Sequence, residues 1–317
     1  MTFHQHAFTD ADLAGITTIT ESNTEVAQKI ALFRSIVIQY PRHLELHDRL
    51  NYLQALGRHS RGKPQMGLRV LAPTGSGKST AAETYKGLVE NIAPPSDEHV
   101  PVLLLPLNSA TTSRRLMVQI LQKLGDPTSE KGSEQALQYR AVNYMRRLGV
   151  ELLIIDEVQH LNYRSNAKID VTDALKSFLD AGVAPIAFLG TEDALPLFAS
   201  NLQLNGRLIA PFDMPKLDIA KAEERSLFAS FVAALCREME NKGLFAAPIT
   251  LVRPDVLGCL MEVADGVIGR VSRLFEVAVE HALRRGAISF EVEDISFAVE
   301  QWAICQGFAK RNPFRAY

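Results

Sequence analysis

The chain is poor in cysteine and in long apolar runs, and its charges nearly cancel. Its three cysteines, Cys236, Cys259 and Cys305, are far apart and form no metal-ligand pattern, so we expect reduced core residues in a cytoplasmic protein. No stretch reaches about 18 uninterrupted apolar residues, and the N-terminus has no signal-peptide run, so no membrane contact is predicted. A formal net charge of −2 excludes strong overall attraction to nucleic acid. Any DNA contact must therefore come from local basic loops.

The strongest chemical signal is a glycine-rich segment. Residues 72–79 read Ala-Pro-Thr-Gly-Ser-Gly-Lys-Ser, a phosphate-binding loop with Ala72 at the opening glycine position. Its glycines let consecutive backbone N–H groups turn towards phosphate oxygens. The lysine supplies a positive charge for the β- and γ-phosphates, and the serine hydroxyl after it is a Mg²⁺ ligand. The residues predicted to bind ATP in this segment are Pro73, Thr74, Gly75, Ser76, Gly77, Lys78, Ser79 and Thr80.

A second signal is an apolar strand that ends in two carboxylates. Residues 152–157 read Leu-Leu-Ile-Ile-Asp-Glu, about 80 residues after the loop. Asp156 is predicted to join Ser79 in holding Mg²⁺, and Glu157 is predicted to polarise the attacking water. The alternative is that Asp156 and Glu157 are simply polar residues at a solvent-exposed strand end. The phosphate-binding loop makes the catalytic interpretation the stronger one, and the pair predicts an ATPase.

Strands alternate with helices up to Pro215, which predicts an α/β fold with a parallel sheet of five strands covered by helices on both faces. The expected strands are residues 66–71, 100–107, 151–156, 184–190 and 208–214. After them the pattern becomes wholly helical. The predicted domains are an N-terminal arm (1–22), helices leading into the core (23–64), the nucleotide-binding domain (65–215), a helical lid (216–309) and a basic tail (310–317), which is a flexible end or a partner contact.

This combination resembles the AAA+ ATPases, and within them the transposition regulators called TniB and TnsC. The motifs that carry the resemblance, besides the two described above, are Tyr40-Pro-Arg-His43, Pro106-Leu-Asn-Ser109, Leu124-Gly-Asp-Pro127, Asp156-Glu-Val-Gln-His-Leu161, Gly190-Thr191 and Gly266-Val-Ile-Gly-Arg270. The resemblance implies an ATP-dependent homo-oligomer, a ring or a filament, that assembles on target DNA. It also implies a link between a target-selector protein and the transposase.

The resemblance suggests roles for three further side chains. Thr191 follows the fourth strand, where a hydroxyl can orient the attacking water, as at the AAA+ position called sensor 1; an N-cap for the helix starting at residue 192 is the alternative. Arg207 precedes the fifth strand, where an AAA+ arginine reaches the γ-phosphate of a neighbouring subunit; an exposed turn arginine is the alternative. Arg270 is the candidate for the lid arginine called sensor 2, with Arg273 as the second choice.

Charge placement points to DNA contacts in two loops. Thr111, Thr112, Arg114 and Arg115 begin a helix, where arginines oppose the helix dipole. A DNA phosphate would remove that penalty, whereas solvated arginines simply tolerate it. Arg164 and Lys168 belong to the second loop. We expect contacts to the backbone of double-stranded DNA that do not depend on sequence.

Three other functions are open to the same motifs. A replication initiator or loader would share the nucleotide chemistry, but the chain leaves little room after the lid for a separate DNA-binding domain. A small-molecule kinase fits the loop, although the Asp-Glu pair is better suited to activating water. A nucleotide-gated scaffold bound to DNA would hydrolyse ATP slowly and use the nucleotide mainly for assembly.

Overall fold

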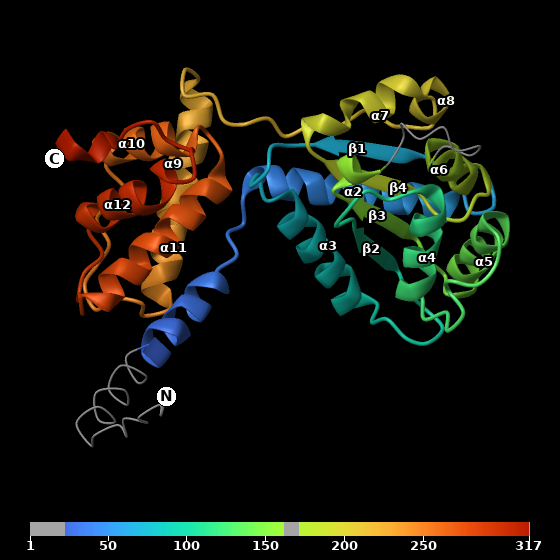
Figure 1. The fold of residues 1–317 in the computed structure, drawn as a ribbon, viewed down its shortest axis with the longest axis horizontal. Helices are drawn as coiled ribbons and strands as arrows, with labels where there is room; N and C mark the ends of the chain where they lie inside the picture. Colours follow the sequence, from blue (N-terminus) through green and yellow to red (C-terminus); the bar gives the residue numbers. More distant parts are fainter. Residues whose placement is uncertain (1–22, 162–170, 317) are drawn as a thin grey trace, which may run out of the picture. The chain divides into compact units, whose positions relative to one another are not determined.

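The computed structural model of the protein describes residues 23–161 and 171–316, and these divide into two compact units (Figure 1). Gln39–Lys216 form an α/β unit. The described residues of Met1–Ile38, together with those of Leu217–Tyr317, form a helical unit. This division differs from the predicted boundary at residue 64, because the first helix groups with the C-terminal helices.

Four parallel strands form the sheet of the α/β unit, in the order β1-β4-β3-β2 (Figure 1). They are β1 (Gly67–Leu71), β2 (Val102–Pro106), β3 (Leu152–Asp156) and β4 (Ile186–Gly190). The register pairs Leu71 with Gly190, and Ile155 with Phe188. The carboxyl ends of β1, β3 and β4 therefore meet at one edge, which is where ligands bind in open α/β sheets.

Helices cover both faces of this sheet because successive strand side chains point to opposite sides. Leu153 and Ile155 of β3 join one buried core with side chains of α4 (Ser113–Lys123), α5 (Glu134–Arg147) and α6 (Val171–Asp180). Leu152 and Ile154 join the opposite core with α2 (Pro41–His59) and α3 (Lys78–Ile92). Burial on both faces explains why this strand is a continuous apolar run.

The predicted fifth strand, residues 208–214, is wrong as a regular strand. The segment runs beside β1 but makes only one β-bridge, between Gly67 and Leu208. Backbone N–H groups of Ile209 and Phe212 donate to the carbonyls of Gly67 and Arg69, at 2.8 and 2.9 Å. The segment thus advances three residues while β1 advances two. Pro211 lies in that interval and has no N–H to donate, so the ladder is interrupted there.

Two short helices, α7 (Leu195–Ser200) and α8 (Leu202–Asn205), lie between β4 and this segment. A helix starting at residue 192 was expected only as the alternative role of Thr191, and hydrophobic periodicity indicated neither helix. The Asn201 side chain accepts the backbone N–H of Leu204 at 2.9 Å and so caps the second of them. Each helix has too few residues to show a clear helical period, which explains why the sequence pattern missed both.

The helical unit contains α9 (Ala222–Asn241), α10 (Pro254–Ala264), α11 (Ile268–Arg284) and α12 (Val292–Ala298), followed by a π-helical segment, Val299–Ile304, and a 3₁₀ turn, Pro313–Ala316. All four α-helices lie in the region after residue 215, which was predicted to be wholly helical. Among the helices of residues 23–161 and 171–316, none is long and apolar enough to cross a bilayer.

Residues 23–34 form the first described helix, which the helical unit holds by polar contacts to α11. Arg34 makes an ion pair of 2.7 Å with Glu276, and Arg284 donates to the Asn23 side chain at 3.0 Å. The segment 23–64 was predicted to contain helices that lead into the core, and the first of them ends at residue 34. The β-branched run Ile36-Val37-Ile38 and the approach to Pro41 both favour extended backbone.

Candidate nucleotide-binding site

The glycine-rich loop connects the end of β1 to the start of α3 at the carboxyl edge of the sheet. Gly75 and Gly77 have φ angles of 83° and 84°, which residues with a Cβ rarely adopt. The first backbone bond of the helix is donated by Ala81 to the carbonyl of Gly77, at 2.8 Å. Earlier N–H groups of the first turn therefore have no acceptor within the helix. Such free N–H groups, at the positive end of the helix dipole, suit a phosphate group.

Lys78 and Glu157 meet across this edge. The Lys78 side chain is only 4% exposed, and its Nζ lies 2.9 Å from Oε1 of Glu157. Glu157 has left-handed backbone with φ 60° and ψ 43°, one of two non-glycine residues with positive φ in the described chain. An unfavourable backbone at the end of a buried strand is typical of functional positions. It turns this carboxylate towards the loop instead of along the strand.

The second oxygen of Glu157 accepts a hydrogen bond from the side-chain amide of Gln159. The carbonyl oxygen of the same amide accepts the backbone N–H of Thr191 at 3.1 Å. One side chain thus joins the end of β3 to the end of β4. Burial raises the pKa of Glu157, but the hydrogen bonds from Lys78 and Gln159 outweigh burial and hold that pKa below its usual value. The carboxylate is therefore ionised at neutral pH, as a base must be.

Asp156 and Thr191 border the same site. Asp156 is 4% exposed, and its Oδ1 accepts the backbone N–H of Glu157 at 2.8 Å. Thr191 directly follows β4, and its hydroxyl donates to Asp193 at 3.1 Å. Its side chain makes no capping bond to the short 3₁₀ helix Glu192–Ala194, so the N-cap alternative is not supported.

The residues at this edge of the sheet fit a nucleoside triphosphate with Mg²⁺. The Ser76 hydroxyl in the loop is buried and has no hydrogen-bond partner among the described residues, so a polar group of a ligand would satisfy it. Lys78 is a buried cation that pairs with the carboxylate of Glu157. Ser79 and Asp156 carry the hard oxygen donors that Mg²⁺ prefers. The residues that would hold the phosphates and the ion thus gather at one edge of the sheet.

Arg207 lies away from its own phosphate-binding loop. Its carbonyl accepts the N–H of Gly67 at the beginning of β1, and the loop follows the end of that strand. Four residues of strand separate the two, roughly 13 Å. The guanidinium is 38% exposed and pairs with Asp180 at 2.7 Å. It therefore faces the surface, and any contact with a phosphate would have to involve another subunit.

The two candidate lid arginines are occupied within the helical unit. Arg270 lies 3.7 Å from Asp265 and stacks on Phe308, with 4.8 Å from its Cζ to the ring centroid. Arg273 forms an ion pair with Glu276. Arg270 is the less exposed of the two, at 25% against 47% for Arg273. The sensor 2 role stays a prediction for both.

The predicted DNA-binding residues of the first loop differ in how they are used. Thr111 is fully buried and its hydroxyl donates to the carbonyl of Ser109 at 2.8 Å, so it presents no group to DNA. Thr112 caps α4 by accepting the N–H of Arg115. The guanidinium of Arg114 donates to the carbonyls of Gly132 and Glu130, at 2.6 and 2.9 Å, which offsets the helix-dipole penalty without DNA.

The side chain of Arg115 is exposed and makes no hydrogen bond or ion pair among the described residues, and it lines a groove of about 450 Å³ with Thr112 and Arg114. Arg115 is therefore the strongest of the predicted DNA contacts. Arg164 and Lys168, the candidates from the second loop, lie outside the described residues.

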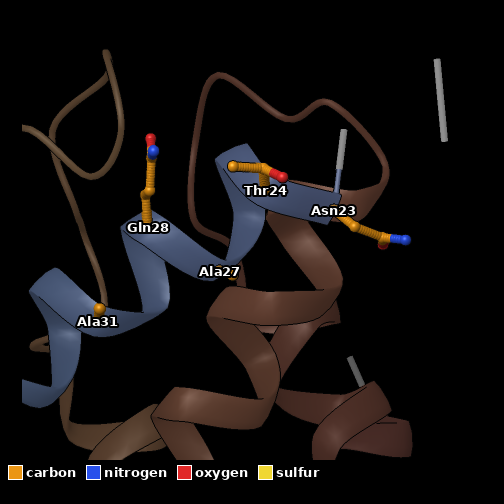
Figure 2. A pocket seen from close by; sticks show the side chains of 5 residues that line it. All are labelled: Asn23, Thr24, Ala27, Gln28 and Ala31. Carbon is orange, nitrogen blue, oxygen red and sulfur yellow. The ribbon is translucent and has the colours of Figure 1, made fainter. Parts of the chain in front are cut away.

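A separate hollow of about 510 Å³ lies along the 23–34 helix and is lined by Asn23, Thr24, Ala27, Gln28 and Ala31. Figure 2 shows that all five side chains come from one helix, with Thr24 and Gln28 on successive turns. None of the five carries a charge. These five residues therefore provide no charged group to a ligand.

Comparison with known families decides which group of proteins these motifs belong to. The family described as "Bacterial TniB protein" matches residues 30–218, more than half of the chain. The chain belongs to the TniB family. No curated protein matches the sequence significantly.

Solved structures show the fold of this TniB protein at low sequence identity. It is similar to the Aeropyrum pernix ORC2 protein in its ADP form, with a TM-score of 0.58 and 15% identity over 86% of this chain and 72% of that one. Cdc6p from Pyrobaculum aerophilum gives 0.61 and 13% over 86% and 70%. The Aeropyrum pernix ORC1 protein in complex with DNA gives 0.60 and 18% over 83% and 66%. The fold is that of AAA+ proteins.

Two residues of the site were not assigned roles from the sequence. Gln159 was noted only as part of the Asp-Glu-Val-Gln-His motif, and His43 only as part of the motif before α2. Each acts on a residue far away in the chain: Gln159 on Thr191, and His43 on the carbonyl of Ser76. A local motif contains no signal for such pairs, although a polar residue two positions after Glu157, the predicted base, is a hint.

Proposed function

We propose that this TniB protein is an ATPase that assembles on target DNA and regulates transposition. The observation that carries the proposal is the ion pair of 2.9 Å between Lys78 of the phosphate-binding loop and Glu157 at the end of β3. It brings the phosphate-binding cation and a candidate base to one sheet edge. The chain that carries this pair belongs to the TniB family.

The chemistry follows from what each side chain can hold or move. The loop N–H groups and Lys78 bind the β- and γ-phosphates of ATP, and Glu157 takes a proton from the attacking water, which the Thr191 hydroxyl orients. Ser79 and Asp156 would hold Mg²⁺, which would offset phosphate charge. Because Lys78 already pairs with Glu157, a γ-phosphate that recruits the lysine leaves one carboxylate oxygen free. The base thus becomes available when its substrate is bound.

Similar solved structures and two arginines at the surface support DNA binding and oligomer formation. Two similar solved structures, the Aeropyrum pernix ORC1 protein in complex with DNA and the Drosophila ORC bound to DNA, contain DNA. In this chain Arg115 offers an exposed guanidinium, and Arg207 faces the surface, where it can reach the phosphate site of a neighbouring subunit. We include Mg²⁺, double-stranded DNA, the transposase and a target-selector protein as the proposed partners.

The decisive experiment compares the parent protein with Glu157→Gln. The variant should bind ATP as tightly as the parent and lose turnover by about 10²- to 10⁴-fold, because an amide cannot act as a base. Nucleotide content after gel filtration and the rate of phosphate release measure the two quantities. Electron microscopy with an ATP analogue and duplex DNA then tests assembly. A parent protein that binds no ATP would refute the proposal.

A replication initiator or loader remains the second candidate, because the similar structures are ORC and Cdc6 proteins. The two functions differ in partner and share the nucleotide site. Stimulation of ATP turnover by a transposase would favour the role in transposition. Stimulation by a replicative helicase would favour the role of a replication loader. A parent turnover close to that of Glu157→Gln, with ATP-dependent assembly intact, would instead indicate a scaffold gated by nucleotide.

A further inference from the structure

His43 contacts the phosphate-binding loop from the side of α2. Its Nε2 lies 3.1 Å from the carbonyl oxygen of Ser76. The same ring occupies the space beside Gly77, where an added Cβ would lie 2.5 Å from Cε1. Any side chain at position 77 would therefore collide with this imidazole, in addition to requiring an unfavourable positive φ. The imidazole of His43 thus fills the space that a side chain at position 77 would need.

The hydrogen on Nε2 can be assigned from its partner. A carbonyl oxygen only accepts, so Nε2 is the nitrogen that donates. Burial lowers the pKa of His43, and the bond to Ser76 only partly opposes this, so the ring is neutral at pH 7. Its place is fixed by the start of α2: Pro41 occupies the first turn, and the backbone N–H of His43 donates to the carbonyl of Tyr40 at 2.8 Å. The donor is therefore held in position by a helix.

The Ser76 carbonyl belongs to the same peptide unit as the N–H of Gly77. In a planar trans peptide these two groups point in opposite directions. A donor that holds the carbonyl of Ser76 on the α2 side therefore directs the N–H of Gly77 to the other side, into the concave face of the loop. That N–H makes no backbone hydrogen bond among the described residues, and it immediately precedes Lys78.

We propose that His43 is a positioning residue for phosphate binding: by holding the Ser76 carbonyl, it aims the Gly77 N–H at the β-phosphate of the nucleotide. This inference rests on the proposed function and adds a residue from outside the loop to it. It assigns His43 a specific effect on ligands that have a β-phosphate, beyond its contribution to packing.

A second histidine provides a matched control. His47 lies one turn further along α2, and its Nε2 lies 2.8 Å from the carbonyl of Ala81. Both rings are partly buried and both contact carbonyls of the loop–helix segment. Ala81, however, is inside α3, so its carbonyl is not part of the peptide unit that faces the phosphate. Loss of the His47 bond should disturb packing without affecting phosphate recognition.

The test uses the full chain with His43→Gln, His43→Met and His47→Met. Gln and Met have nearly the same shape, and only Gln retains an amide N–H donor where the imidazole had one. Affinities for ADP and AMP are measured by competition with a fluorescent ADP, and melting temperatures are recorded for all proteins. His43→Met should bind ADP about 3- to 10-fold more weakly than His43→Gln, as expected for the loss of one hydrogen bond. AMP affinities should agree within about twofold, and His47→Met should keep the parent ratio of ADP to AMP affinity.

Several results would overturn this inference. Equal ADP affinities for His43→Gln and His43→Met would show that the donor is irrelevant. A parallel loss of ADP and AMP binding, or the same loss in His47→Met, would reduce His43 to a packing residue. These results are distinct from failure of the proposed function, in which the parent protein itself would bind neither ADP nor ATP.

Discussion

Lys78 and Glu157 lie 79 positions apart in the chain, and their charged groups are 2.9 Å apart in the fold. This pair links the cation that binds phosphate to the carboxylate that can act as a base. The lysine is almost completely buried, whereas the glutamate side chain is 31% exposed. A phosphate that enters from solvent can therefore compete with the glutamate for the lysine.

Lys78→Ala should abolish nucleotide binding and nucleotide-dependent assembly, because the phosphates lose their fixed counter-charge. Equilibrium binding of fluorescent ATP and gel filtration with ATP and DNA measure the two effects. Lys86→Ala is the matched control, since Lys86 lies on the same helix and pairs with Glu90 at the surface. Normal oligomers of Lys78→Ala on DNA with ATP would contradict the assignment of the loop.

Gln159→Leu should leave ATP binding within about threefold of the parent and reduce turnover by about tenfold or more, since a misplaced general base loses much of its effect. The replaced side chain no longer holds the carboxylate of Glu157 or the N–H of Thr191. Single-turnover hydrolysis with saturating ATP measures the effect. Gln135→Leu, on the exposed surface of α5, serves as the control. Unchanged turnover would reduce Gln159 to a structural link between the strand ends.

Arg207→Ala should retain ATP binding and lose turnover by about 10³-fold, if the guanidinium offsets transition-state charge at a neighbouring subunit. Mixing it with Glu157→Gln protein should restore part of the turnover, at interfaces that pair an intact Arg207 with an intact Glu157. Asp180→Asn removes the ion-pair partner of Arg207 and a longer pair of 4.0 Å with Lys176, leaves the guanidinium in place, and should keep most of the activity. If co-assembled mixtures recover nothing at any ratio, action between subunits is refuted.

Arg115→Ala should weaken binding to all duplex sequences about equally and reduce the salt slope by about 0.9 for the lost phosphate contact. Arg114→Ala should have a smaller effect on DNA, because the guanidinium of Arg114 is engaged by two carbonyls. Lys123→Ala, at the other end of the same helix, carries the same change in charge and should leave the slope unchanged. Fluorescence anisotropy over a range of salt concentrations measures the slopes. An unchanged slope for Arg115→Ala would place the DNA surface elsewhere.

Asp294→Asn should destabilise the helical unit by about 2 kcal/mol at pH 7, because a fully buried carboxylate loses its charge-assisted bonds. Asp294 accepts two bonds of 2.9 Å from Arg285 and one of 2.8 Å from His281. Urea unfolding followed by fluorescence reports on this unit, since Trp302, the single tryptophan, belongs to it. Asp255→Asn removes an exposed pair with Arg253 and should cost much less.

The stability difference between the parent and Asp294→Asn should depend on pH. Burial raises the pKa of Asp294, but the bonds from Arg285 and neighbouring groups outweigh burial and hold the pKa below its ordinary value. The folded pKa is thus depressed, so the stabilisation is present above the unfolded pKa and is lost as pH falls through the folded one. The difference between parent and Asp294→Asn should therefore shrink at acidic pH. A difference that stays constant down to pH 2 would contradict this cause.

The sequence alone was enough to predict the elements whose signals are local. The phosphate-binding loop needs glycines at two turn positions, Gly75 and Gly77, and the buried strand β3 needs an unbroken apolar run; both can be recognised within ten residues. The alternation of strands and helices then led to the parallel sheet, which the structure confirms, and to the four α-helices after residue 216. The early end of the first helix at residue 34 follows from local β-branched residues and could have been predicted as well.

Only the tertiary structure decided the features that depend on neighbours distant in the chain. Residues 208–214 have the apolar composition of a strand, yet Pro211 and one extra residue prevent a regular ladder with β1. Gln159 joins Glu157 to Thr191, and His43 fills the space beside Gly77, because the fold brings α2, β3 and β4 to the same sheet edge. Hydrophobic period and propensity report the environment of a residue along its own element. They contain no information on which distant polar group it meets, and that pairing determines the chemistry of the site.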